Sequence, residues 1–117
     1  MDAGSVVVVF VTVPSADVGE RLATALVAER LAACVNIVPG LRSIFSWEGR
    51  IAEESELLLL VKTRASRLPE LEARVRTLHP YSVPEILAVP AVAGHAPYLA
   101  WVGDSVTVKG GDESDQE

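Results

Sequence analysis

The feature that most constrains the fold is a pair of β-prone arms between Ala33 and Arg64, joined through Trp47-Glu48-Gly49-Arg50. The second arm contains the unbroken apolar run Leu57-Leu58-Leu59-Leu60-Val61, which is typical of a strand buried on both faces. Gly49 allows a tight turn between the arms. In the first arm, Pro39-Gly40 lacks one ladder donor and relaxes φ, so we expect a bend or bulge there. The stretch therefore predicts one long β-hairpin.

This hairpin is too long for the globule that carries it. Arms of roughly 15 residues reach on the order of 50 Å, whereas a compact chain of this size is roughly 35 Å across. The overhanging tip carries Ile44, Phe45 and Trp47. Such a tip would promote aggregation if it stayed exposed, so we expect other copies of the chain to cover it. The sequence thus predicts an obligate oligomer with Phe45 and Trp47 in its interface.

Composition sets the outer bounds on class and compartment. The chain has 117 residues, half of them hydrophobic, which is enough for one core and too little for two. Its net charge of -6 opposes binding to nucleic acid or to anionic membranes, so neither is expected as a partner. The single Cys34 excludes an internal disulfide, and the N-terminus lacks the basic start of a signal peptide. We therefore expect a cytoplasmic protein.

The remaining elements follow from hydrophobic spacing and from Pro and Ser positions. The expected order is a strand at Val6–Val11, a helix capped by Ser15, the hairpin, a helix opened by Ser66 and stopped by Pro80, a strand at Glu85–Val89, and a helix from Pro97. The first helix has the stripe Val18, Leu22, Ala25, Leu26 and Leu31, and the second Leu68, Leu71, Val75 and Leu78. This order predicts an α+β, ferredoxin-like βαββαβ sandwich with an added C-terminal helix, spanning residues 1–108 as a single domain. Residues 109–117 are expected to form an acidic, disordered tail.

Several motifs resemble one known family. They are Leu31-Ala32-Ala33-Cys34-Val35-Asn36, Trp47-Glu48-Gly49, Lys62-Thr63, His79-Pro80-Tyr81 with Val83-Pro84-Glu85, and Tyr98 with Trp101. In this order they resemble the CutA divalent-cation tolerance proteins over roughly residues 6 to 103. The resemblance implies a ferredoxin-like homotrimer whose hairpins pair with neighbouring subunits, similar in architecture to PII-type signalling trimers. It also implies a link to divalent-cation tolerance and copper binding.

The sequence departs from the family pattern at positions that bear on metal. Family members proposed to bind copper carry a Cys before the Thr-x-Pro that closes the first strand and a His before His-Pro-Tyr. Here Val11 and Leu78 occupy those positions, and only His79 matches. Ser82 stands where the family often has Glu, which removes an oxygen ligand. Phe45 stands where it often has Tyr, which keeps the ring but removes the hydroxyl.

Cys34 and His79 are the candidate metal ligands, since copper favours thiolate and imidazole donors. The alternative for Cys34, which we favour, is a small buried hydrophobe. The alternative for His79 is a structural role at a helix end, and both remain open. Two donors are too few for a tight site, so we expect weak, exchangeable binding of copper or another divalent cation, with no cofactor needed for folding. The acidic Glu53-Glu54-Glu56 is interpreted as a solvated hairpin edge.

A second group of residues suits a small ligand. Lys62, Tyr81 and Glu85 lie with His79 near predicted strand and helix ends, where pockets between subunits often form. No hydrolase, zinc-protease, P-loop or dinucleotide motif is present, which favours a binding protein over an enzyme. Trp101 is expected, like Trp47, to be a packing anchor in an interface rather than a stacking platform. Two hypotheses follow: a trimeric metal-responsive binding protein, or a small-molecule-sensing PII-like trimer or cryptic enzyme with clefts between subunits.

Overall fold

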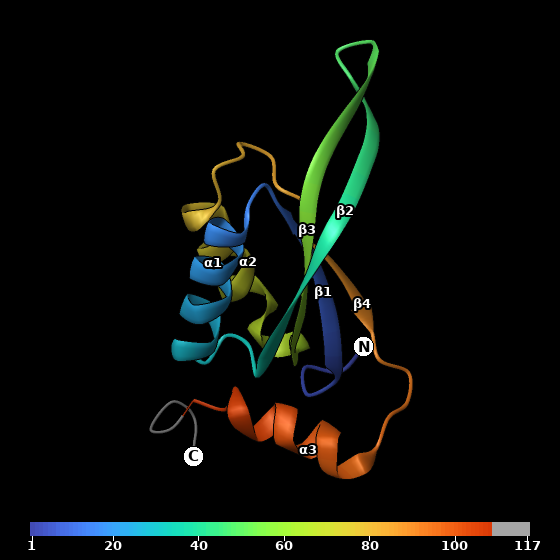
Figure 1. Cartoon of the computed structure of the whole chain (residues 1–117). Coiled ribbons are helices and arrows are strands. Elements are labelled where there is room, and N and C mark those ends of the chain that lie inside the picture. Colours follow the sequence, from blue (N-terminus) through green and yellow to red (C-terminus); the bar gives the residue numbers. More distant parts are fainter. Residues whose placement is uncertain (109–117) are drawn as a thin grey trace.

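The computed structural model describes residues 1–108, so the predicted tail at 109–117 lies outside the described part of the chain. The elements in order are β1 (Val6–Val13), α1 (Ala16–Ala28), β2 (Cys34–Trp47), β3 (Arg50–Arg64), a 3₁₀ turn (Ala65–Arg67), α2 (Leu68–Leu78), β4 (Leu87–Pro90) and α3 (Ala96–Ser105) (Figure 1). No helix within residues 1–108 combines the length and the apolar character that crossing a bilayer requires.

The four strands form one antiparallel sheet in the order β2-β3-β1-β4, and α1 and α2 lie together on one of its faces (Figure 1). Strand order and helix placement are those of the ferredoxin-like fold, which confirms the predicted class. The added helix α3 packs across the other face at one end of the sheet, where Val102 and Val106 meet Ala33 and Val6.

The core lies between the sheet and the α1–α2 layer. Alternate residues of β1 point into it and are fully buried: Val7, Val9, Val11 and Val13. The register sets them beside β3, whose Leu59 and Val61 are equally buried, and the helices add Leu22, Leu26, Leu71 and Val75. On the opposite face, Val8 and Phe10 of β1 and Leu58 and Leu60 of β3 remain partly exposed, because α3 covers only one end of that face. The expectation that the Leu57–Val61 run is fully buried on both faces is therefore wrong for a single subunit.

Helix α1 begins as predicted and ends earlier than its apolar stripe suggests. The Ser15 hydroxyl accepts a hydrogen bond from the Val18 amide at 3.2 Å. The helix ends at Ala28, and Arg30 adopts a φ of 58°, which reverses the chain. Leu31 therefore lies beyond the helix, although it is buried and its amide donates to the Leu26 carbonyl at 2.9 Å. The prediction that Leu31 belongs to the helix is therefore wrong, whereas the prediction that it is buried is confirmed.

The long hairpin is confirmed in detail. Its arms have 14 and 15 residues, and it makes the longest dimension of the chain 50 Å, against 28 and 24 Å for the other two (Figure 1). The turn uses positive φ angles at Glu48 and Gly49, 51° and 79°. The expected bulge lies between Val38 and Leu41, where Gly40 has a φ of 84°. The far half of the hairpin projects beyond the globule.

Two smaller boundaries differ from the prediction. Ser66 lies in the 3₁₀ turn, and α2 starts two residues later at Leu68, with Pro69 in its first turn. The last strand covers Leu87–Pro90 rather than Glu85–Val89. Pro90 pairs with Val7 on the edge of the sheet, where a residue without an amide hydrogen is tolerated.

Candidate functional site

His79 is buried at the end of α2, with both ring nitrogens engaged. Its Nε2 lies 2.7 Å from the Thr12 carbonyl oxygen, and the Tyr81 amide donates to its Nδ1 at 3.1 Å. Because Nδ1 accepts, Nε2 must carry the hydrogen and donate it to Thr12. The ring is therefore a neutral link between the end of β1 and the loop after α2. A metal ion could bind either nitrogen only by replacing one of these hydrogen bonds.

Tyr81 extends this link to the hairpin. Its hydroxyl donates to Glu56 Oε2 at 2.8 Å, and its ring centroid lies 4.7 Å from that of His79. Glu56 is only 8% exposed, so the interpretation of all three hairpin glutamates as solvated is wrong for this one. Burial, followed by the hydrogen bond to Glu56 and the charges of Glu56 and Glu54, raises the pKa of Tyr81 to about 12. We name Thr12, His79, Tyr81 and Glu56 the hairpin-base cluster.

The sequence pointed to two members of the hairpin-base cluster and missed the other two. His79 and Tyr81 are conspicuous by residue type, whereas Thr12 takes part only through its carbonyl oxygen, for which side-chain chemistry gives no signal. The alternation of residues along β3 could have indicated that Glu56 is buried, because Glu56 lies on the same sheet face as the partly buried Leu58 and Leu60.

Cys34 lies at the other end of the sheet from the hairpin-base cluster. It is half-buried at the start of β2 and pairs with Lys62, whereas Thr12 pairs with Leu58. Four residues along β3 separate these pairs, which is about 13 Å. Cys34 and His79 therefore do not share a site within one subunit. In the described part of the chain, no three His, Cys, Asp or Glu side chains are grouped as a metal site would need.

The predicted small-ligand residues are also divided in one subunit. The Lys62 ammonium donates to the Asn36 side-chain oxygen near Cys34. Tyr81 lies instead in the hairpin-base cluster, and Glu85 is exposed in the loop that precedes β4. The register places Lys62 opposite Val8, about 13 Å from Thr12 along the sheet. A pocket that used all three residues would need more than one copy of the chain.

The predicted interface residues are all exposed in the single chain. Phe45, Trp47 and Trp101 are 40%, 58% and 48% exposed, and the ring of Trp101 packs on that of Tyr98, with ring centroids 5.7 Å apart. The sheet face opposite α1 and α2 continues this apolar surface with Val8, Phe10, Leu58, Leu60, Leu87 and Val89, all of them partly or well exposed. We call this face together with the hairpin tip the open apolar surface. Within residues 1–108, α3 covers this surface at one end of the sheet.

The fold and the open apolar surface define a class: a ferredoxin-like domain with a projecting hairpin. Comparison with known proteins identifies the family. Residues 7–105 match the model of the family described as CutA1 divalent ion tolerance protein, so the chain belongs to the CutA1 family. It is 56% identical over 98 residues to the divalent-cation tolerance protein CutA of Thermus thermophilus, covering 84% of this chain and 95% of that one.

Two further comparisons extend the likeness to eukaryotes. The chain is 46% identical over 112 residues to human protein CutA, covering 90% of this chain and 63% of the human one. The crystal structure of CutA1 from Oryza sativa superposes with a TM-score of 0.87 at 45% identity, covering 90% of this chain and 96% of that one. The fold is therefore similar to a solved family member over nearly its whole length.

Proposed function

We propose that this chain is the subunit of a cytoplasmic homotrimer that acts in tolerance of divalent metal ions, copper among them, by weak and reversible binding. Its family and its relative in Thermus thermophilus are both named for tolerance of divalent ions. The proposal describes a binding protein rather than an enzyme. The observation that supports the assembly is the open apolar surface, which a partner of matching shape would bury.

Assembly of identical copies explains why the open apolar surface can exist. Ile44, Trp47 and Ile51 at the hairpin tip are 66%, 58% and 84% exposed, which is a hazard for an isolated soluble chain. A closed ring buries the same surface in every copy, whereas an open arrangement would extend into a fibre. Three copies are the number that the family resemblance implies.

Weak metal binding follows from the donor set of one subunit. Tight transition-metal sites take three or four protein ligands, and Cys34 and His79 lie too far apart to contribute to the same one. Freeing either nitrogen of His79 also sacrifices a hydrogen bond, which lowers the net gain from coordination. We therefore expect exchangeable Cu(II) or Zn(II) binding that the fold does not need.

Sedimentation equilibrium at micromolar concentration tests the assembly, and a stable, folded monomer would refute it. Calorimetric titration with Cu(II) tests the metal sites in the parent, His79→Gln and Cys34→Ser proteins. We expect weak binding that His79→Gln reduces. Submicromolar binding that is unchanged in both variants would show that neither residue is a ligand.

A further inference from the structure

A groove of about 390 Å³ runs between the end of α1 and the outer side of α2, on the helix layer. Its lining residues are Glu29, Leu31, Arg67, Glu70, Ala73, Arg74 and Thr77. The buried Leu31 contributes an apolar wall, and the small Ala73 leaves room between neighbouring turns of α2. The groove is shallow and wide open to solvent, so it would hold one end of a small molecule rather than enclose it.

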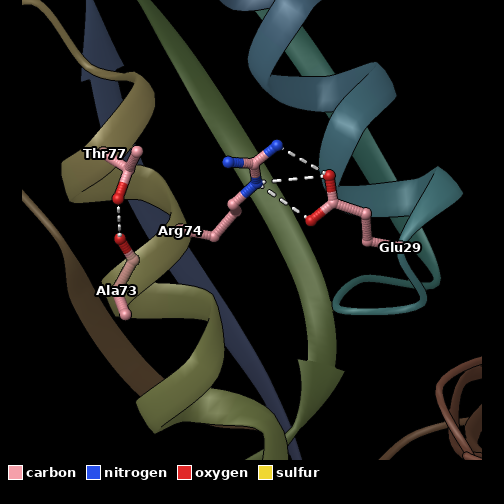
Figure 2. Close-up of polar contacts among 4 residues, drawn as sticks. All are labelled: Glu29, Ala73, Arg74 and Thr77. Carbon is pink, nitrogen blue, oxygen red and sulfur yellow. Dashed lines mark hydrogen bonds and ion pairs between the residues drawn. The ribbon is translucent and has the colours of Figure 1, made fainter.

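Two guanidinium groups line this groove: Arg74 on α2, and Arg67 at the end of the 3₁₀ turn, directly before the first residue of α2. Arg74 reaches across to Glu29, the residue that directly follows α1, and its Nε and Nη2 donate to the Glu29 carboxylate at 2.9 Å each (Figure 2). Arg67 is more enclosed, with 13% of its side chain exposed, and donates to the Arg30 carbonyl oxygen at 3.3 Å and to Glu70 at 2.6 Å.

Both guanidiniums retain donors for a further acceptor. Arg74 Nη1 points away from Glu29 in Figure 2, and neither it nor Arg67 Nη2 has a hydrogen-bond partner within residues 1–108. Guanidinium groups bind carboxylate and phosphate oxygens in pairs, and they do so more strongly beside apolar surface than in open water. The groove therefore offers a small oxyanion an apolar wall and two guanidiniums, each of which is also paired with a lining carboxylate, Arg74 with Glu29 and Arg67 with Glu70.

We propose that this groove binds a small metabolite through its carboxylate or phosphate group, with Arg74 as the main contact and Arg67 as the second cation. Glu29 occupies Arg74 in the absence of ligand and competes with it. The Glu29 and Arg74 side chains are 41% and 37% exposed, and ion pairs as open as this one exchange partners at little cost. The groove lies at α1 and α2. These helices are on the opposite side of the sheet from the open apolar surface (Figure 1), so assembly through that surface leaves the groove accessible.

Calorimetric titration at constant ionic strength tests this site, with inorganic phosphate and succinate as the probes and chloride as the balancing anion. We expect saturable binding of at least one probe, and which of them binds more tightly separates a phosphate ligand from a carboxylate ligand. Arg74→Gln should weaken binding at least about tenfold. Arg76→Gln is the matched control, because it removes the same charge from an exposed position of α2 outside the groove.

Glu29→Gln separates an oxyanion site from an ion pair that only holds two helices together. If Glu29 competes with the ligand, its neutralisation should tighten binding by up to about fivefold, the range set by exposed ion pairs. Unchanged or weaker binding in Glu29→Gln would overturn the proposal. So would the absence of saturable binding in both the parent and this variant, or equal effects of Arg74→Gln and Arg76→Gln.

Discussion

Removing the Tyr81 hydroxyl should weaken the hairpin-base cluster by a measurable amount. Tyr81→Phe keeps the ring that packs on His79 and deletes only the donor to Glu56. A hydrogen bond to a charged group contributes about 1.5–3 kcal/mol to the free energy of unfolding. Leaving a buried acceptor without a hydrogen bond has a similar cost. Because Tyr81 is only half-buried, water can replace part of this bond, and we expect a loss of about 1–2 kcal/mol per subunit at pH 7.

The same bond predicts a dependence on alkaline pH. The pKa of Tyr81 is raised to about 12 in the folded chain, above the unfolded value of 10.0. Between these values the folded state keeps a proton that the unfolded state has released, so stability falls as the pH rises. This contribution is complete below about pH 10 and is lost as the pH approaches 12. Tyr81→Phe should lack this part of the alkaline loss.

Chemical denaturation at fixed subunit concentration, repeated from pH 7 to 11.5, measures both effects. Tyr98→Phe is the matched control, because the Tyr98 hydroxyl has no hydrogen-bond partner within residues 1–108. The pKa of Tyr98 is also raised, by burial and by the charge of Cys34. A smaller loss of stability at alkaline pH should therefore persist in Tyr81→Phe. A Tyr81→Phe protein with the stability and pH profile of the parent would refute the assigned bond.

Three further predictions concern assembly, the turn and metal. Trp47→Asp should weaken assembly, because it places a charge in a closed apolar contact, and a trimer as heat-resistant as the parent would exclude that placement. Gly49→Ala should lower the free energy of unfolding by about 1 kcal/mol, because the φ of 79° at Gly49 disfavours a side chain. Gly4→Ala is the control and should change little, because Gly4 has open space around it and no positive φ. Melting in chelator should match melting in buffer, and a lower midpoint would indicate a structural metal.

The hairpin was predictable because every local signal agrees. Gly49 marks the turn, Pro39-Gly40 marks the bulge, and Leu57–Val61 marks a strand, and each lies close in sequence to what it determines. The same holds for the Ser15 cap of α1. The end of α1 was less predictable, since a left-handed Arg30 buries Leu31 by reversing the chain rather than by continuing the helix.

The candidate sites were less predictable because their partners are distant in sequence. His79 bonds to a carbonyl oxygen 67 residues away, and Tyr81 bonds to a glutamate 25 residues away that lies in an acidic run. Arg74 pairs with Glu29 across 45 residues, so the groove exists only once α1 and α2 have packed side by side. These contacts depend on tertiary packing, which propensity and periodicity do not encode.

Oxyanion binding and assembly should be separable, because they use opposite sides of the sheet. At a concentration where Trp47→Asp has dissociated but retains its circular dichroism spectrum, phosphate should bind with the same affinity as in the parent. The reason is that Glu29, Arg67 and Arg74 line a groove at α1 and α2, which lie on the opposite side of the sheet from the open apolar surface. A pocket built from Lys62 and Tyr81 would behave differently, because these residues are brought together only between copies. Loss of phosphate binding on dissociation would therefore place the anion at a subunit boundary instead of in the helix groove.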